Sequence, residues 1–161
     1  MGKHQDGDGG VHMGRASAHA FSPEVLVDLR RSAGLSQAAL GDALGVSSGS
    51  VRAWERGRKI PQADMLGRLA ELLSAALSST VTVADLVDIP DTGRTLADWR
   101  VLRALTQGEA ARRAGLSTSH YGAIERGDSP LAAHSVPHLA DALGITPDEV
   151  IAAAGEGGQG G

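Results

Sequence analysis

The feature that most constrains the fold is a pattern that occurs twice, in residues 37–57 and again in residues 107–127. In each copy, apolar residues recur at helical spacing on both sides of a central glycine, Gly45 or Gly115. A serine or threonine, residue types that cap helix N-termini, stands before each half. Because glycine adopts positive φ without a steric penalty, each copy is predicted to form two short helices joined by a tight turn.

A repeat of this length in a chain of 161 residues indicates an internal duplication and therefore two small domains. We predict an all-α fold of two tandem five-helix domains with disordered tails. In the second copy, the small residues Ala110 and Ala114 leave space that Tyr121 is expected to fill. The predicted boundaries are a disordered N-terminal tail at 1–21, a first domain at 22–89, a linker at 90–94, a second domain at 95–153 and a flexible C-terminal tail at 154–161.

The charge of the chain is unevenly distributed. Its formal net charge is −4, which is unfavourable for a protein that binds polyanionic nucleic acid. Residues 23–61, however, contain six basic and four acidic side chains, and residues 94–130 have the same balance, so each segment carries 6 − 4 = +2. The sequence therefore predicts a local basic face on each repeat within an acidic chain.

Other features argue against catalysis and against a membrane location. The chain has no cysteine, and we find neither a transmembrane segment nor a signal peptide, so a cytoplasmic location is expected. His134, His138 and Asp141 have the spacing of one helix side, but Pro137 intervenes and no fourth ligand is apparent, so no metal is expected. Neither a nucleophile turn nor a phosphate-binding loop is present. We therefore expect no enzyme activity and no cofactor.

The flanks of the repeat carry a further pattern. Leu35-Ser36-Gln37 precedes the first copy and Trp54-Glu55-Arg56-Gly57 ends it, while Leu105-Thr106-Gln107 and Ile124-Glu125-Arg126-Gly127 frame the second. With these residues the chain resembles the lambda-repressor and Cro type of helix-turn-helix domain, also called Xre-like. The resemblance implies five helices per domain, with the motif at the second and third helices. It also implies structural ion pairs between Arg30 and Glu55 and between Arg100 and Glu125.

In the first repeat the resemblance implies a DNA-binding surface. Gln37 would reach a phosphate and support the recognition helix, and Arg52 is the only long hydrogen-bond donor among the base-reading positions. An arginine that binds guanine through two hydrogen bonds would discriminate between bases, whereas the plainer alternative for Arg52 is an exposed helix residue. The base-reading positions are Ser47, Ser48, Gly49, Arg52 and Ala53, and the expected backbone contacts are Arg56, Arg58 and Lys59, which are otherwise a solvated loop.

The second repeat departs from this pattern. Its reading positions include Gly122 and Ala123 and offer no long donor, and Asp128 stands where the first repeat has Arg58. His120 is either one further DNA contact or an ordinary exposed histidine. The residues carried over to DNA are Gln107, Ser117, Thr118, Ser119, His120 and Arg126. We expect the first repeat to dominate binding, with the second reading weakly, resting on phosphates or serving as a dimerisation unit.

Two functions are consistent with these features. The preferred one is a sequence-specific transcriptional regulator that binds double-stranded DNA, with the recognition helix of the first repeat in the major groove, acting alone or as a homodimer. The alternative is a non-catalytic interaction module, an antitoxin or adaptor that holds a protein partner on the same scaffold. Neither function involves a membrane.

Overall fold

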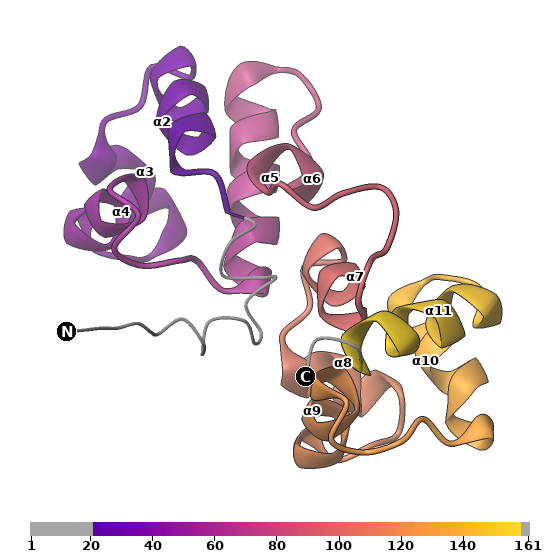
Figure 1. The fold of residues 1–161 in the computed structure, drawn as a ribbon. Coiled ribbons are helices and arrows are strands. Elements are labelled where there is room, and N and C mark those ends of the chain that lie inside the picture. The colour runs from indigo at the N-terminus through magenta and orange to yellow at the C-terminus, as the bar shows by residue number, and fades with distance from the viewer. Residues whose placement is uncertain (1–20, 159–161) are drawn as a thin grey trace, which may run out of the picture. The chain divides into compact units, whose positions relative to one another are not determined.

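The computed structural model describes residues 21–158 (Figure 1). Within this range the regular structure consists of ten α-helices and a short 3₁₀ turn, and the only extended pairing is an isolated bridge between Phe21 and Val87. The described residues divide into two compact units on either side of the Asp88–Ile89 bond, which we call domain 1 and domain 2. The predicted all-α class and the two five-helix domains are confirmed. No helix between residues 21 and 158 is long and apolar enough to cross a membrane.

Domain 1 is built around the first copy of the repeat. Leu40 and Leu44 on the second helix and Val51 and Trp54 on the third are buried in its core, at the positions that the helical spacing predicts. The long helix that follows adds the buried side chains Leu66, Leu69 and Leu73. The five helices are α2 (Pro23–Ser32), α3 (Gln37–Leu44), α4 (Ser48–Glu55), α5 (Ala63–Leu77) and α6 (Val83–Leu86).

The turn between α3 and α4 has the geometry that its sequence predicts. Gly45 has φ +75°, in the left-handed region, and a Cβ built on Gly41 would lie 2.7 Å from the carbonyl oxygen of Val46. The hydroxyl of Ser36 accepts a hydrogen bond from Ala39 N at 2.9 Å, and that of Ser47 accepts one from Ser50 N at 3.0 Å. Local chemistry therefore fixes where both helices begin and how closely they cross.

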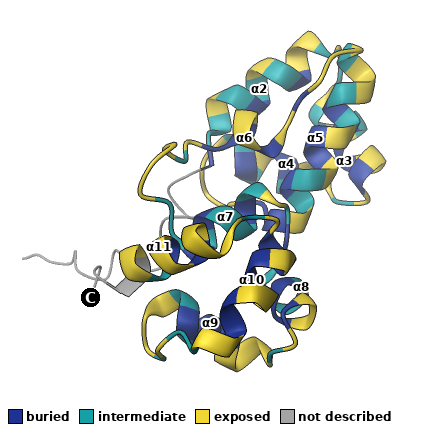
Figure 2. Cartoon of the chain, turned by 90° about the vertical axis from the view of Figure 1, so that its right-hand side faces the viewer, coloured by how far each residue is buried: buried dark blue, intermediate teal, exposed yellow. Residues whose placement is uncertain are grey.

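Domain 2 repeats this arrangement with a different core. Tyr121 is fully buried among Ala110, Ala111 and Ala114, so the expectation that it fills the space left by small residues is confirmed. Figure 2 shows buried and exposed sides on the helices that follow residue 106, whereas the first helix of the domain carries only buried and half-buried residues. They are α7 (Leu96–Leu102), α8 (Gln107–Arg113), α9 (Thr118–Arg126), α10 (Val136–Leu143) and α11 (Pro147–Gly158), with the 3₁₀ turn η2 (Ala133–Ser135) before α10.

The ends of the described chain differ from the predicted boundaries. Phe21, assigned to the N-terminal tail, is only 7% exposed, because it pairs with Val87 at the end of domain 1. Helix α11 continues to Gly158 rather than ending at residue 153, since three consecutive alanines (Ala152–Ala154) favour helix and Ala153 is buried. The rest of the two predicted tails, residues 1–20 and 159–161, lies outside the described residues.

One turn differs between the domains in a way that affects stability. After α2 the chain turns at Gly34 with φ +71°, and at the matching place after α7 it turns at Ala104 with φ +59°. An alanine in the left-handed region is strained by about 1–2 kcal/mol. Glycine relieves this strain, but its larger unfolded-state entropy offsets part of the gain in stability. Ala104→Gly is therefore expected to stabilise domain 2 by about 0.5–1 kcal/mol in urea unfolding. Gly34→Ala is the matched control in domain 1, and a loss of stability with Ala104→Gly would contradict the prediction.

Candidate nucleic-acid interface

Helix α4 presents one side to the core of domain 1 and the other to solvent. Val51 and Trp54 are buried, whereas Ser48, Gly49 and Arg52 are exposed. Ser47 caps the helix, and its Oγ also lies 3.1 Å from Ser50 Oγ, so the first turn is closed by short polar side chains. The exposed side chains at the N-terminal end of α4 are therefore short, and one long cationic side chain, Arg52, follows a turn later.

A buried ion pair holds the C-terminal end of α4 against the first helix of the domain. Nε and Nη2 of Arg30 donate to both carboxylate oxygens of Glu55, with Nη2 and Oε1 3.0 Å apart, and the two side chains are 9% and 6% exposed. Nη1 of Arg30 also donates to Leu35 O at 2.7 Å. The pair implied by the resemblance is confirmed, and it fixes the orientation of α4 relative to α2.

Gln37 joins this network from the start of α3. Its Nε2 donates to Glu55 Oε1 at 2.9 Å, and the residue is half-buried. Burial alone raises the pKa of Glu55, but the hydrogen bonds from Arg30 and Gln37 outweigh that effect and hold the pKa below its usual value. The part of the predicted role in which Gln37 supports the recognition helix thus has a physical basis in this hydrogen bond.

A basic loop follows α4. Arg56, Arg58 and Lys59 are exposed, and within residues 21–158 none of them forms an ion pair with a carboxylate. The backbone of the loop is held in place, since the amides of Arg58 and Lys59 both donate to Ala53 O, at 2.9 and 3.3 Å. The loop is consequently an anchored strip of positive charge at the end of α4.

Domain 2 has the same ion pair, glutamine hydrogen bond and serine cap as the site in domain 1. Nε of Arg100 donates to Glu125 Oε2 at 2.6 Å, and Gln107 Nε2 donates to Glu125 Oε1 at 2.8 Å. Ser117 caps α9 by accepting from His120 N at 3.1 Å. The predicted site residues at this helix start, Ser117, Thr118, Ser119 and His120, are all exposed, Ala123 and Gln107 are half-buried, and Arg126 is exposed.

The reading position at Gly122 is an exception. Gly122, which the resemblance places among the reading positions, is buried. A Cβ built on it would lie 3.1 Å from Arg126 Nη1 and 3.6 Å from Gln107 Oε1, because the side chains of both residues lie over the bare backbone. Arg126 Nε in turn contacts Asp128 Oδ2 at 2.9 Å. The spacing in the sequence showed that a long donor was missing at Gly122 but not that a neighbour covers it.

Two arginines outside the repeated pattern cap helices of their domains through hydrogen bonds between distant residues. Arg68 on α5 donates from Nη2 to Leu44 O, at 2.7 Å, and thereby caps the C-terminus of α3 just before the motif turn. Arg103 donates from Nε to Leu143 O at 2.8 Å and caps the C-terminus of α10. Neither contact is predictable from the sequence, because the partners are 24 and 40 residues away and no local motif marks them.

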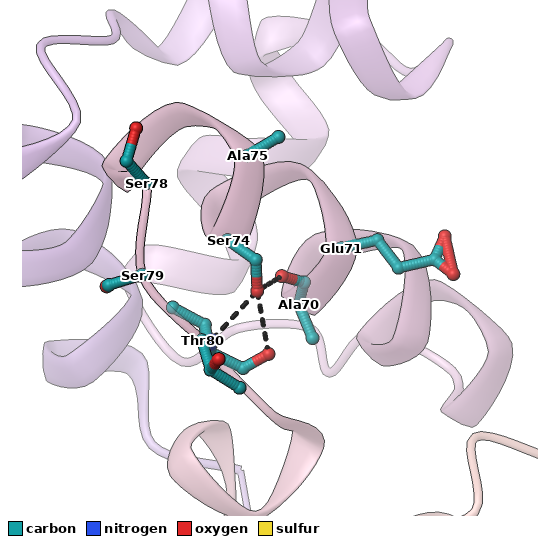
Figure 3. Close-up of a pocket in the computed structure, with 8 residues that line it drawn as sticks. Ala70, Glu71, Ser74, Ala75, Ser78, Ser79 and Thr80 are labelled. Carbon is teal, nitrogen blue, oxygen red and sulfur yellow. Dashed lines mark hydrogen bonds between the residues drawn. The ribbon is translucent and has the colours of Figure 1, made fainter.

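Two further places in the described chain bring polar side chains together or were candidates for doing so. Figure 3 shows a depression at the end of α5, where Ser74 Oγ accepts from Val81 N at 2.8 Å and lies within hydrogen-bond distance of Ala70 O and Val81 O. These bonds tie the segment that follows α5 to the helix and engage the Ser74 hydroxyl. His134, His138 and Asp141 are exposed, and no group of three or more His, Cys, Asp or Glu side chains converges within residues 21–158.

Two family-model matches place this geometry among known proteins. A family model described as Helix-turn-helix matches residues 26–77, and another described as Helix-turn-helix domain matches residues 91–153. A comparison with curated proteins gave no match. The fold and the two sites are those of helix-turn-helix proteins, the class of DNA-binding regulators, whose domains are typically non-enzymatic. The chain belongs to the lambda-repressor type of this class, also called Xre-like, with two domains in tandem.

Proposed function

We propose that the protein is a sequence-specific transcriptional regulator that inserts α4 of domain 1 into the major groove of double-stranded DNA. One observation carries the proposal: the outer side of α4 exposes small residues at its N-terminal end and then Arg52, within a helix held rigidly by the buried Arg30–Glu55 pair. Because the side chains of its first turn are short, the helix can approach base edges closely. A guanidinium binds guanine through two hydrogen bonds. The proposed base-reading set is Ser47, Ser48, Gly49, Arg52 and Ala53.

The loop after α4 supplies the complementary phosphate contacts in this proposal. Arg56, Arg58 and Lys59 are exposed and adjacent, and Gln37 lies at the start of the neighbouring helix. Each phosphate neutralised releases condensed counterions, so affinity should fall linearly with salt on logarithmic axes, with a slope of about −0.9 per contact. This local charge offsets the net charge of −4, which would otherwise repel DNA.

The proposal includes a cytoplasmic protein with no enzyme activity and no cofactor. The net charge of −4 favours one competing function, an antitoxin or adaptor that holds a protein partner on the same scaffold. Failure of the full chain to bind any duplex at low salt would support that function and overturn the regulator.

Selection of bound duplexes from a random pool tests the proposed function. A regulator enriches a defined motif, and a single half-site would indicate one reading helix. Two half-sites about 34–36 Å apart would indicate two reading helices on one face of the DNA. Recovery of unenriched sequence from a chain that does bind would contradict sequence-specific recognition.

Arg52→Ala is expected to weaken binding to the selected site by roughly 5- to 150-fold, equivalent to about 1–3 kcal/mol, and to weaken binding to random duplex far less. The reason is that a base contact contributes only where the correct base is present. Lys59→Ala is the matched comparison, and it should weaken both duplexes equally and reduce the salt slope by about 1. Titrations by fluorescence anisotropy measure both effects, and equal losses with Arg52→Ala would make Arg52 a phosphate contact.

A further inference from the structure

The recognition helices of the two domains differ at one surface position. Gly122 on α9 occupies the place that Arg52 occupies on α4, since the repeat offset is 122 − 52 = 70. Helix side chains lean towards the N-terminus, so a long side chain at position i+4 passes over position i. With no side chain at Gly122, the guanidinium of Arg126 reaches the helix backbone, where Nη1 would lie 3.1 Å from a Cβ. The cationic group therefore lies along α9 instead of projecting from the loop.

A carboxylate holds the guanidinium in this position. Arg126 Nε and Asp128 Oδ2 are 2.9 Å apart, and the two side chains are 54% and 64% exposed. The loop of domain 1 has Arg56, Arg58 and Lys59 in the corresponding segment, for a charge of +3, whereas residues 126–129 of domain 2 sum to zero because Asp128 cancels Arg126. Residues 56–59, which would face phosphates in domain 1, are thus positively charged, whereas the corresponding residues 126–129 of domain 2 carry no net charge.

We propose that Asp128 takes the place of a DNA phosphate on Arg126 and thereby sets the low DNA affinity of domain 2. This inference rests on the proposed function, and it assigns Asp128 as a residue that determines how the two domains share DNA binding. An exposed ion pair contributes little to folding, so a substitution at Asp128 should change binding without unfolding the domain. The contacts that hold α9 in place, the Arg100–Glu125 pair and the Ser117 cap, are both present. We therefore expect a substitution at Asp128 to restore DNA affinity to domain 2.

The test is a salt titration of the full chain on a duplex of fixed arbitrary sequence, between about 50 and 200 mM salt. Asp128→Arg frees Arg126 and adds the charge found at Arg58, so two further phosphates should be neutralised. The expected slope is steeper by about 2, with a gain in affinity of about tenfold at the low-salt end. Asp128→Asn, which only frees Arg126, should steepen the slope by about 1.

Asp141→Arg is the matched control, because Asp141 is exposed on α10, forms no ion pair within residues 21–158, and gives the same charge change. It is expected to leave the slope unchanged. An equal effect of Asp128→Arg and Asp141→Arg, or no effect of Asp128→Arg in a folded chain, would overturn the inference. If the wild-type chain binds no duplex, the proposed function fails and the inference fails with it, whereas binding by the wild type that Asp128→Arg leaves unchanged overturns the inference alone.

Discussion

Arg30→Ala is expected to destabilise domain 1 by about 3–5 kcal/mol, because it leaves the buried carboxylate of Glu55 without its cationic partner. The substitution also removes the donor to Leu35 O, so the end of α2 loses its tie to the start of α3. Urea unfolding followed by circular dichroism measures the change in free energy. A loss below about 1 kcal/mol would mean that the pair behaves like a surface salt bridge and does not orient α4.

The pH dependence of the same variant provides an independent check. The pKa of Glu55 lies below its usual value in the folded state, so its stabilising contribution is fully present above the unfolded value of about 4.3 and is lost as pH falls through the folded value. The stability difference between wild type and Arg30→Ala should therefore shrink in acid. The matched control Arg31→Ala, an exposed arginine next along α2, should change stability by less than about 1 kcal/mol.

Tyr121→Ala is expected to cost domain 2 about 3–5 kcal/mol, whereas Tyr121→Phe should change its stability by less than about 1 kcal/mol. Tyr121 is fully buried and packs in a core otherwise rich in alanine, so truncation leaves a cavity that small neighbours cannot fill. Its hydroxyl has no hydrogen-bond partner among the described residues. Removing an unpartnered buried polar atom takes away a desolvation cost and leaves the ring packing unchanged.

The ring hydroxyl also stays protonated throughout the pH range of ordinary measurements. Burial raises the pKa of Tyr121, and the nearby carboxylate of Glu125 raises it further. Thermal and urea unfolding of both variants should therefore give the same ranking at neutral and at mildly alkaline pH. A loss above about 2 kcal/mol with Tyr121→Phe would show that the hydroxyl makes a hydrogen bond after all.

The parts of the fold that the sequence predicted are those set by local chemistry. Ser36, Ser47 and Gly45 act on their own helix ends, so caps and a left-handed turn can be inferred from spacing alone. The duplication then strengthened each inference, because the second copy places Thr106, Ser117 and Gly115 at the same points. The ion pairs needed more than spacing, since they join residues that lie 25 positions apart and were implied only by resemblance.

The features that escaped prediction depend on which side chains meet in three dimensions. The burial of Gly122 results from Arg126 and Gln107 lying over it, and a glycine alone does not reveal what covers its backbone. Phe21 is buried because Val87, far along the chain, returns to pair with it. Helix α11 runs on because Ala153 packs in the domain core, which compensates for the glycines that follow.

The two tryptophans of the chain fall one in each domain. Trp54 is 7% exposed in the apolar core of domain 1, whereas Trp99 is half-buried in domain 2, with the guanidinium of Arg94 4.7 Å and that of Arg103 5.8 Å from its ring centroid. The indole of Trp99 therefore has guanidinium groups over its ring, whereas that of Trp54 has apolar neighbours, and these environments affect indole fluorescence differently. The chain thus carries two built-in fluorophores in distinct environments, and a variant that keeps only one of them would report the melting of its own half without an attached label.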